Sequence, residues 1–162
     1  MSNLEKKVDA IIRLLTAADS TSYDTAMARI RALEEPEQRK TDNMDARIET
    51  GRILTELGMP EHILGHSYNV EAIALAVEDK TIIHQMTDRL YPEVAARCGS
   101  TPTRTERAMR HAIELAWDRC DMDVAEKYFG STVSPARGKP TNSEFIARIA
   151  GIVRQRVAGL PQ

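Results

Sequence analysis

The chain has 162 residues, of which 42% are apolar, 28% are charged and 4% are aromatic. These values are those of an ordinary globular protein and exclude a wholly disordered chain. The longest apolar run, residues 72–77, is far shorter than the roughly 20 residues that span a bilayer. Because the N-terminus is charged and only two cysteines are present, we expect a cytoplasmic protein without export signal, membrane segment or disulfide framework.

The net charge of −2 is unevenly distributed. Residues 51–96 contain three basic and seven acidic side chains, whereas residues 97–156 contain eleven basic and seven acidic ones. The total charge neither indicates nor excludes a polyanionic partner, but a basic C-terminal half is compatible with one.

Residues 1–42 are predicted to form two short helices and a polar linker. The first helix has apolar residues at helical spacing: Leu4, Val8, Ile11 and Leu15. The second is predicted over residues 22–35 and stops at Pro36, and the linker follows over residues 36–42. Each helix would expose an apolar stripe, so we expect the stripes to pack on each other, on the main domain or on a second subunit in a heptad-like seam.

The main domain, residues 43–162, is predicted to be all-α, because it shows helical periodicity and no sustained strand alternation. Three helices are predicted from their apolar positions: one with Ile48, Ile53, Leu54 and Leu57, one with Val70, Ile73, Ala74 and Val77, and one with Ile82, Ile83, Met86 and Leu90. Gly58 is expected to end the first, and Pro92 to kink or restart the third. Further helices are predicted over residues 102–119, 123–128 and 142–156.

Residues 91–110 have the pattern of a helix-turn-helix. Ala95 is small where two helices must approach closely, and Gly99 can adopt the left-handed backbone that turns the chain. Thr101 and Pro102 are a favourable N-cap and first-turn pair for the second helix. That helix is expected to anchor itself in the core by three apolar residues: Met109, Ile113 and Ala116.

The opposite face of this helix carries side chains that can read DNA. Arginine donates bidentately to guanine in the major groove and glutamate accepts from cytosine, so Glu106 and Arg107 are predicted to read bases, with Thr103 on the same face. Arg104 and Arg110 are predicted to read bases or to neutralise phosphates. In the alternative interpretation, Glu106 and Arg110 only form a solvated ion pair along the helix. Helical spacing alone leaves both interpretations open.

Four motifs follow one another along the chain: Gly58-Met-Pro-Glu-His-Ile-Leu-Gly65, Leu90-Tyr-Pro-Glu-Val-Ala95, Glu106-Arg-Ala-Met-Arg-His-Ala-Ile-Glu114 and Lys139-Pro-Thr-Asn-Ser-Glu-Phe-Ile-Ala147. With them, residues 43–156 resemble the C-terminal DNA-binding effector domain of the stage-zero sporulation response regulator, sporulation protein A. The resemblance implies a compact six-helix bundle whose fourth helix, here beginning at Pro102, enters the major groove. It also implicates Glu106, Arg107 and Arg110 in DNA contact.

The chain is therefore predicted to be a sequence-specific regulator that binds double-stranded DNA, as a dimer or as side-by-side copies, without catalytic residues, cofactor or metal. His111 is expected either to reach a phosphate or to have a buried or half-buried structural role. Lys139, with the N-terminus of a helix capped by Asn142, is expected near the DNA backbone.

Two departures from the family pattern alter the expected regulation. The family regulator carries a receiver domain of about 120 residues, which the 42 residues before Asn43 cannot hold, so aspartyl phosphorylation of this chain is not expected. The family contacts the sigma subunit of RNA polymerase through the segment after the reading helix. Here residues 118–127 are unusually acidic, which favours repression or competition for sites over activation.

Other chemistry has weaker support. An alternative function is a protein-interaction module that titrates a full-length regulator, or forms heterodimers with it, through the N-terminal helices. His62 and His66 have metal-ligand spacing beside Glu61, but the sequence offers no clear further ligands. Five other residues are expected to fill the core: Cys98, Cys120, Trp117, Phe129 and Phe145.

Overall fold

The computed structural model describes residues 6, 8, 11, 42–130 and 138–159. The chain divides into two compact units, Met1–Asp42 and Asn43–Gln162. In the first unit Lys6, Val8 and Ile11 are helical, and the two apolar side chains are exposed. Leu4, Leu15, the helix predicted over residues 22–35 and residues 36–41 of the predicted linker lie outside the described residues, whereas Asp42, the last residue of that linker, is helical.

In the second unit every described regular element is helical, which confirms the all-α prediction. The six α-helices are a helix over residues 42–56, α3 (Leu64–Glu78), α4 (Tyr91–Cys98), α5 (Pro102–Arg119), α6 (Met122–Phe129) and α7 (Asn142–Val157). A 3-10 turn, η1 (Lys80–His84), and a π turn, η2 (Met86–Leu90), connect α3 to α4. The helix that begins at Pro102 is therefore the fourth, as the resemblance implies.

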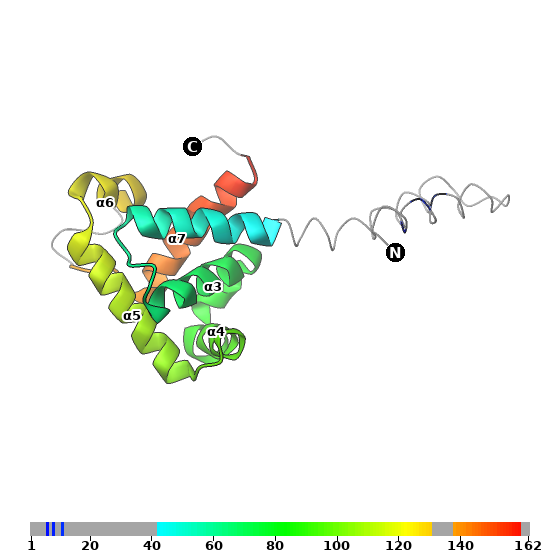
Figure 1. The fold of residues 1–162 in the computed structure, drawn as a ribbon, viewed down its shortest axis with the longest axis horizontal. Helices are drawn as coiled ribbons and strands as arrows, with labels where there is room; N and C mark the ends of the chain where they lie inside the picture. Colours follow the sequence, from blue (N-terminus) through cyan, green and yellow to red (C-terminus); the bar gives the residue numbers. More distant parts are fainter. Residues whose placement is uncertain (1–5, 7, 9–10, 12–41, 131–137, 160–162) are drawn as a thin grey trace. The chain divides into compact units, whose positions relative to one another are not determined.

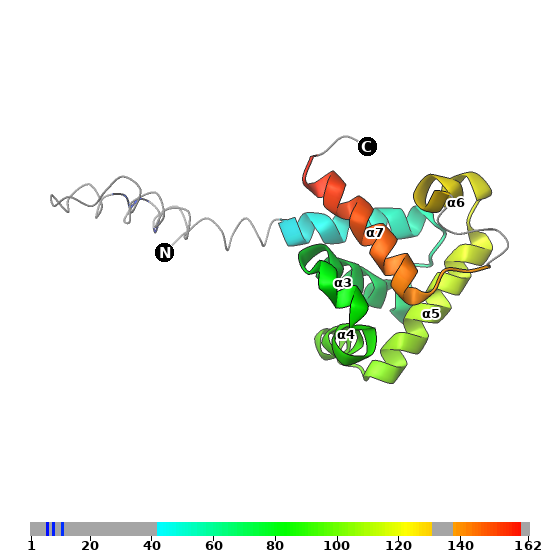
Figure 2. The ribbon, with the colours of Figure 1, turned by 180° about the vertical axis from the view of Figure 1, so that it is seen from behind.

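Helix α3 is the centre of the bundle and packs against α4, α5 and α7 (Figures 1 and 2). Because it has neighbours on several sides, its buried residues do not form one stripe, and they include an unbroken run of small or aliphatic side chains: Ala72, Ile73, Ala74, Leu75 and Ala76. The four residues predicted to form its apolar face all face the core, since Ile73 and Ala74 are buried and Val70 and Val77 are half-buried and pack against the core, but the buried surface extends beyond that face.

Helices α3 and α5 approach each other closely at Gly65. A Cβ atom at this position would lie 2.1 Å from the carbonyl oxygen of Ala108 and 2.6 Å from the Cβ of Ala112. One turn further along α3, the buried Asn69 amide donates to the carbonyl oxygens of Gly65 (2.7 Å) and Met109 (3.4 Å). A glycine and a buried amide therefore set the separation of the two helices.

The helix over residues 42–56 packs by a stripe that differs from the predicted one at a single position. Ile53, Leu54 and Leu57 are buried, and Gly58, with φ +80°, follows the helix as expected. Ile48 is 51% exposed, so its placement in the core is wrong. The buried residues at positions 46 and 50 define the inner side of this turn, and Ile48 lies two residues from each of them, on the opposite side.

The single helix predicted from Ile82 to Leu90 is broken. Gln85 has non-helical backbone angles (φ −127°, ψ 46°), although Ile82 and Leu90 are both buried as expected. The Asp79 carboxylate accepts from the backbone N–H of Thr81 at 2.8 Å, which starts the 3-10 turn in place of an α-helix. Pro92 lies in the first turn of α4, and because Leu90 and Tyr91 before it also have right-handed helical backbone angles, the interruption is at Gln85 and not at the proline.

Aromatic side chains pack where α5, α6 and α7 meet. The ring of Phe129 lies 5.4 Å from that of Trp117 and 5.5 Å from that of Phe145, measured between centroids. Both phenylalanines are buried, whereas Trp117 is half-buried at the edge of the core. Cys98 and Cys120 are half-buried free thiols, and burial raises the pKa of each. Across the described segments, no helix is both long and apolar enough to cross a membrane.

Candidate nucleic-acid interface

The turn between α4 and α5 has the predicted helix-turn-helix geometry. Ala95 is buried, and its carbonyl oxygen accepts from the backbone N–H of Ser100 at 2.9 Å. Gly99 adopts a left-handed conformation (φ 63°, ψ 40°), and a Cβ atom there would meet no other atom within 4 Å. The glycine is therefore needed for its backbone angles and not for space.

The start of α5 is fixed by its own sequence. The Thr101 hydroxyl accepts from the backbone N–H of Arg104 at 3.4 Å, and Pro102 occupies the first turn. Farther along the helix, Met109, Ile113 and Ala116 are buried as predicted. In Figure 1 the first turns of α5 lie beside α4 at the lower end of the bundle.

This anchoring leaves the other side of α5 in solvent. The exposed side chains include Thr103, Arg104, Arg107, Arg110 and His111, and Glu106 is half-buried. The exposure of His111 removes the buried or half-buried structural role that was one of its two predicted alternatives. We call these six residues the α5 face.

The charges on the α5 face are only partly neutralised within the chain. Arg110 donates to the Glu106 carboxylate one turn away, so the solvated pair of the alternative interpretation is present. Such a pair stabilises a helix by about 0.2–0.5 kcal/mol, too little to hold the arginine against a better acceptor. Arg104 and Arg107 have no side-chain partner among the described residues. Two guanidinium groups are thus available to an external ligand.

Lys139 lies beside the α5 face but has an acidic partner. Its ammonium group is 3.0 Å from the Asp118 carboxylate at the end of α5. A hollow of about 370 Å³ between α5 and the start of α7 is lined by both Lys139 and Arg110. The structure therefore brings these two cations to one hollow, with Lys139 already paired.

The N-cap of α7 is Thr141, so the prediction of Asn142 in that role is wrong. Thr141 and Glu144 form a reciprocal capping box, which satisfies the first backbone N–H groups of the helix. Asn142 is instead the first helical residue and is 8% exposed. Its amide donates to the Tyr91 hydroxyl and to the Glu106 carbonyl oxygen.

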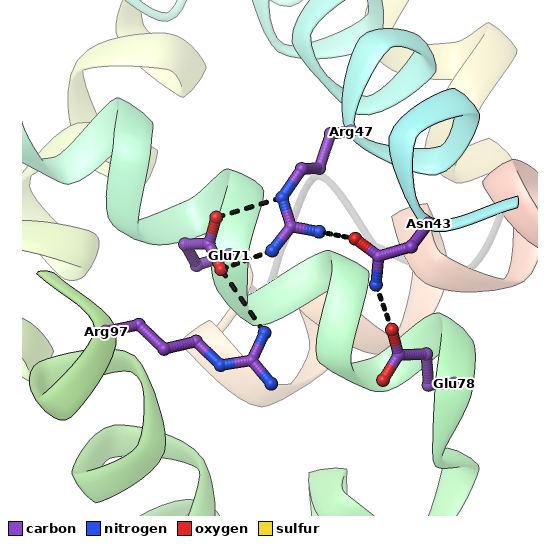
Figure 3. Close-up of polar contacts among 5 residues, drawn as sticks. All are labelled: Asn43, Arg47, Glu71, Glu78 and Arg97. Carbon is purple, nitrogen blue, oxygen red and sulfur yellow. Dashed lines mark hydrogen bonds and ion pairs between the residues drawn. The ribbon is translucent and has the colours of Figure 1, made fainter. Parts of the chain in front are cut away.

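A polar cluster outside the α5 face connects three helices (Figure 3). The Glu71 carboxylate of α3 accepts from Arg47 of the first helix at 3.0 and 2.6 Å, and from Arg97 of α4 at 3.4 Å. Asn43 bridges Arg47 to Glu78 by two further hydrogen bonds. The cluster ties α4 to the remainder of the bundle.

Sequence reasoning missed both the Glu71 cluster and the Asn142 contacts. Apart from Asn43 and Arg47, which are four residues apart, the partners are 24, 26, 35, 36 or 51 positions apart in the chain, so helical spacing does not relate them. The motif that contains Asn142 also contains the core residues Phe145 and Ile146, but it does not indicate the partners of the amide.

The histidine pair has no metal-binding surroundings in the described parts of the chain. No group of three or more His, Cys, Asp or Glu side chains gathers there. The Glu61 carboxylate accepts from Thr55 at 2.8 Å, and burial lowers the pKa of His66. The neutral form of His66 is therefore favoured.

The sequence that forms the described bundle matches a known protein family. The family model described as "Sporulation initiation factor Spo0A C terminal" matches residues 50–153, which extend from the first helix of the second unit into α7 and include the whole helix-turn-helix.

Proposed function

The chain belongs to the family of sporulation initiation factor Spo0A C-terminal domains, and we propose that it is a transcriptional regulator that reads double-stranded DNA through α5. The family is one of DNA-binding effector domains of sporulation regulators, so binding is the proposed activity, without catalysis. The observation that carries the proposal is the α5 face: the exposed guanidinium groups of Arg104 and Arg107, which pair with no side chain among the described residues, project from a helix whose other side is buried in the core.

Each residue of the α5 face has a role suited to its chemistry. Arg107 and Arg104 donate to guanine edges in the major groove, and Glu106 accepts from cytosine. Arg110 exchanges its contact with Glu106 for a base or phosphate. Thr103 and His111 donate to phosphates. Lys139 contacts the DNA backbone once its ion pair with Asp118 is broken.

The proposed regulator acts as a dimer or as adjacent copies, because one helix reads only a few base pairs. Acidic residues at the end of the reading helix and directly after it lie on the surface: Asp118, Asp121, Asp123 and Glu126. This acidity supports repression or competition for sites over activation through the polymerase sigma subunit. Residues 1–42 are proposed to form a separate extension that mediates dimerisation or control.

Selection of binding sites from randomised duplex DNA tests the proposal directly. The full chain should recover a preferred sequence, and Arg107→Ala should weaken binding to it by about 1–3 kcal/mol and relax base choice at one position. Arg52→Ala is a matched control, since Arg52 is also an exposed helical arginine, 76% exposed, but lies on the first helix. Equal effects of the two substitutions would remove Arg107 from base reading.

The interaction-module alternative is favoured by one observation: residues 51–162 contain fourteen basic and fourteen acidic side chains. Salt dependence separates the two functions. For DNA binding, the logarithm of affinity should fall with the logarithm of salt concentration, by about 0.9 for each neutralised phosphate. A flat response would support the interaction module.

A further inference from the structure

Asn142 occupies a junction of three helices. It is the first residue of α7 and is buried, yet its side-chain amide has two hydrogen-bond partners on other elements. Nδ2 donates to the Tyr91 hydroxyl, 3.1 Å away at the first residue of α4, and to the Glu106 carbonyl oxygen, 3.4 Å away in α5. Both hydrogens of one amide therefore join the two helices of the helix-turn-helix.

The helix that carries Asn142 is itself firmly anchored. Thr141 and Glu144 cap its first turn, and the Ser143 hydroxyl donates to the Ile83 carbonyl oxygen at 3.4 Å. Phe145 and Ile146, directly after this turn, are buried. The backbone that carries the Asn142 side chain is therefore held in place by the neighbouring elements.

The acceptor in α5 lies in the part of the helix proposed to read DNA. The carbonyl of Glu106 is next in the chain to Arg107, and Tyr91 and Asn142 line the same hollow as Arg110. A displacement of α5 relative to α4 would therefore move the guanidinium groups of the α5 face. Site geometry must hold to within about 0.5 Å and 10–20° for directional contacts of this kind.

We propose that Asn142 and Tyr91 are positioning residues for base reading, since together they fix α5 relative to α4. This inference rests on the proposed function. Bidentate contacts to bases need exact placement of the arginine, whereas phosphate contacts tolerate small displacements because they are largely ionic. Loss of the amide should therefore lower discrimination between DNA sequences more than it lowers binding to DNA in general.

The test compares three variants of the full chain on two DNA probes. The probes are a duplex that the wild-type chain selects from randomised DNA and a scrambled duplex of the same length and composition, both at one salt concentration. Asn142→Ala removes both donors, and Tyr91→Phe removes only the acceptor hydroxyl. Tyr128→Phe is the matched control, because it also removes a tyrosine hydroxyl with a side-chain partner, here Glu56. The unfolding midpoint of each variant is measured in parallel.

We expect Asn142→Ala to reduce the affinity ratio of the two duplexes about tenfold, the loss expected for one misplaced base contact. Tyr91→Phe should reduce it about threefold. For both, affinity for the scrambled duplex should stay within about twofold of wild type. Tyr128→Phe should lower the unfolding midpoint and leave the ratio unchanged.

An unchanged ratio in both Asn142→Ala and Tyr91→Phe would overturn the inference, as would a parallel fall on both duplexes in step with the unfolding midpoint. If Asn142→Ala does not fold, the affinity ratio of the two duplexes for Tyr91→Phe alone tests the inference. A wild-type chain that selects no duplex overturns the proposed function itself, which is a distinct result.

Discussion

Gly65 shows how one missing side chain determines the packing of the bundle. Because a Cβ atom there would lie 2.1 Å from backbone of α5, Gly65→Ala forces α3 and α5 apart. We expect the free energy of unfolding to fall by about 3 kcal/mol, at the upper end of overpacking costs. Urea unfolding, followed by far-UV circular dichroism, measures the change.

Gly51 supplies the control for this substitution. It lies inside the helix over residues 42–56, and a Cβ atom there meets nothing within 4 Å. Gly51→Ala should therefore raise the free energy of unfolding by about 0.5–1 kcal/mol through helix propensity. If both substitutions lowered the free energy of unfolding by a similar amount, the contact between α3 and α5 would be looser than described.

Glu56 gives the stability of the bundle an acid dependence. Hydrogen bonds from Lys127 and Tyr128 hold the pKa of this carboxyl below its ordinary value of 4.5. A carboxyl with a lowered folded pKa stabilises the fold above its unfolded pKa, and this contribution disappears as pH falls through the folded value. Glu56→Gln should therefore lower the urea midpoint at pH 6 and show a smaller further loss between pH 5 and pH 3 than wild type. The same acid-induced loss in both chains would contradict the assignment.

Helices and their ends were largely predictable because their signals are local. A threonine before Pro102, a glycine at position 99 and a glycine at position 58 act on neighbouring backbone and need no tertiary information. The break at Gln85 was not predictable, because a side-chain contact of Asp79 competes with the helical hydrogen bonds of the same segment. The outward placement of Ile48 depends on which side of its helix meets the bundle, which a four-residue pattern does not determine.

Polar contacts join the first helix and α4 to α3, and Glu71 of α3 makes one with each of them. Arg47 is bound bidentately and its side chain is 25% exposed, whereas Arg97 makes one 3.4 Å contact and is 41% exposed. Substitution by glutamine should therefore cost most at Glu71, about 1–3 kcal/mol, less at Arg47 and least at Arg97, below about 1 kcal/mol. Urea unfolding of the three variants gives the order. If substitution of Arg97 lowered the free energy of unfolding more than substitution of Arg47, the contact with α4 would be the more stabilising of the two.

The α5 face illustrates what the sequence could and could not predict about the site. Exposure of Arg104 and Arg107 followed from the buried positions Met109, Ile113 and Ala116, since both patterns belong to one helix. The partners of Lys139 and Asn142 come from other parts of the chain, so neither the ion pair with Asp118 nor the burial of the amide could be read from spacing.

For the chain as a whole, the described core is confined to the second unit. Its buried cluster extends from Ala46 to Val153, and the family match covers residues 50–153. Removal of residues 1–42 takes away no described member of that cluster. We therefore expect residues 43–162 to unfold in a single cooperative transition and to select the same DNA sequence as the full chain.

The same pair of chains tests the role proposed for residues 1–42. A heptad-like seam made by these residues would bring two reading helices together, so the full chain should sediment as a dimer and residues 43–162 as a monomer. Affinity for a single site should then be equal for the two chains, while affinity for two adjacent sites should be higher for the full chain, because the second contact becomes intramolecular. If both chains sediment in the same oligomeric state and bind paired sites with equal affinity, the seam is contradicted. The extension would then bind the domain or another protein. Loss of base preference on truncation would show instead that residues 1–42 contribute to reading itself.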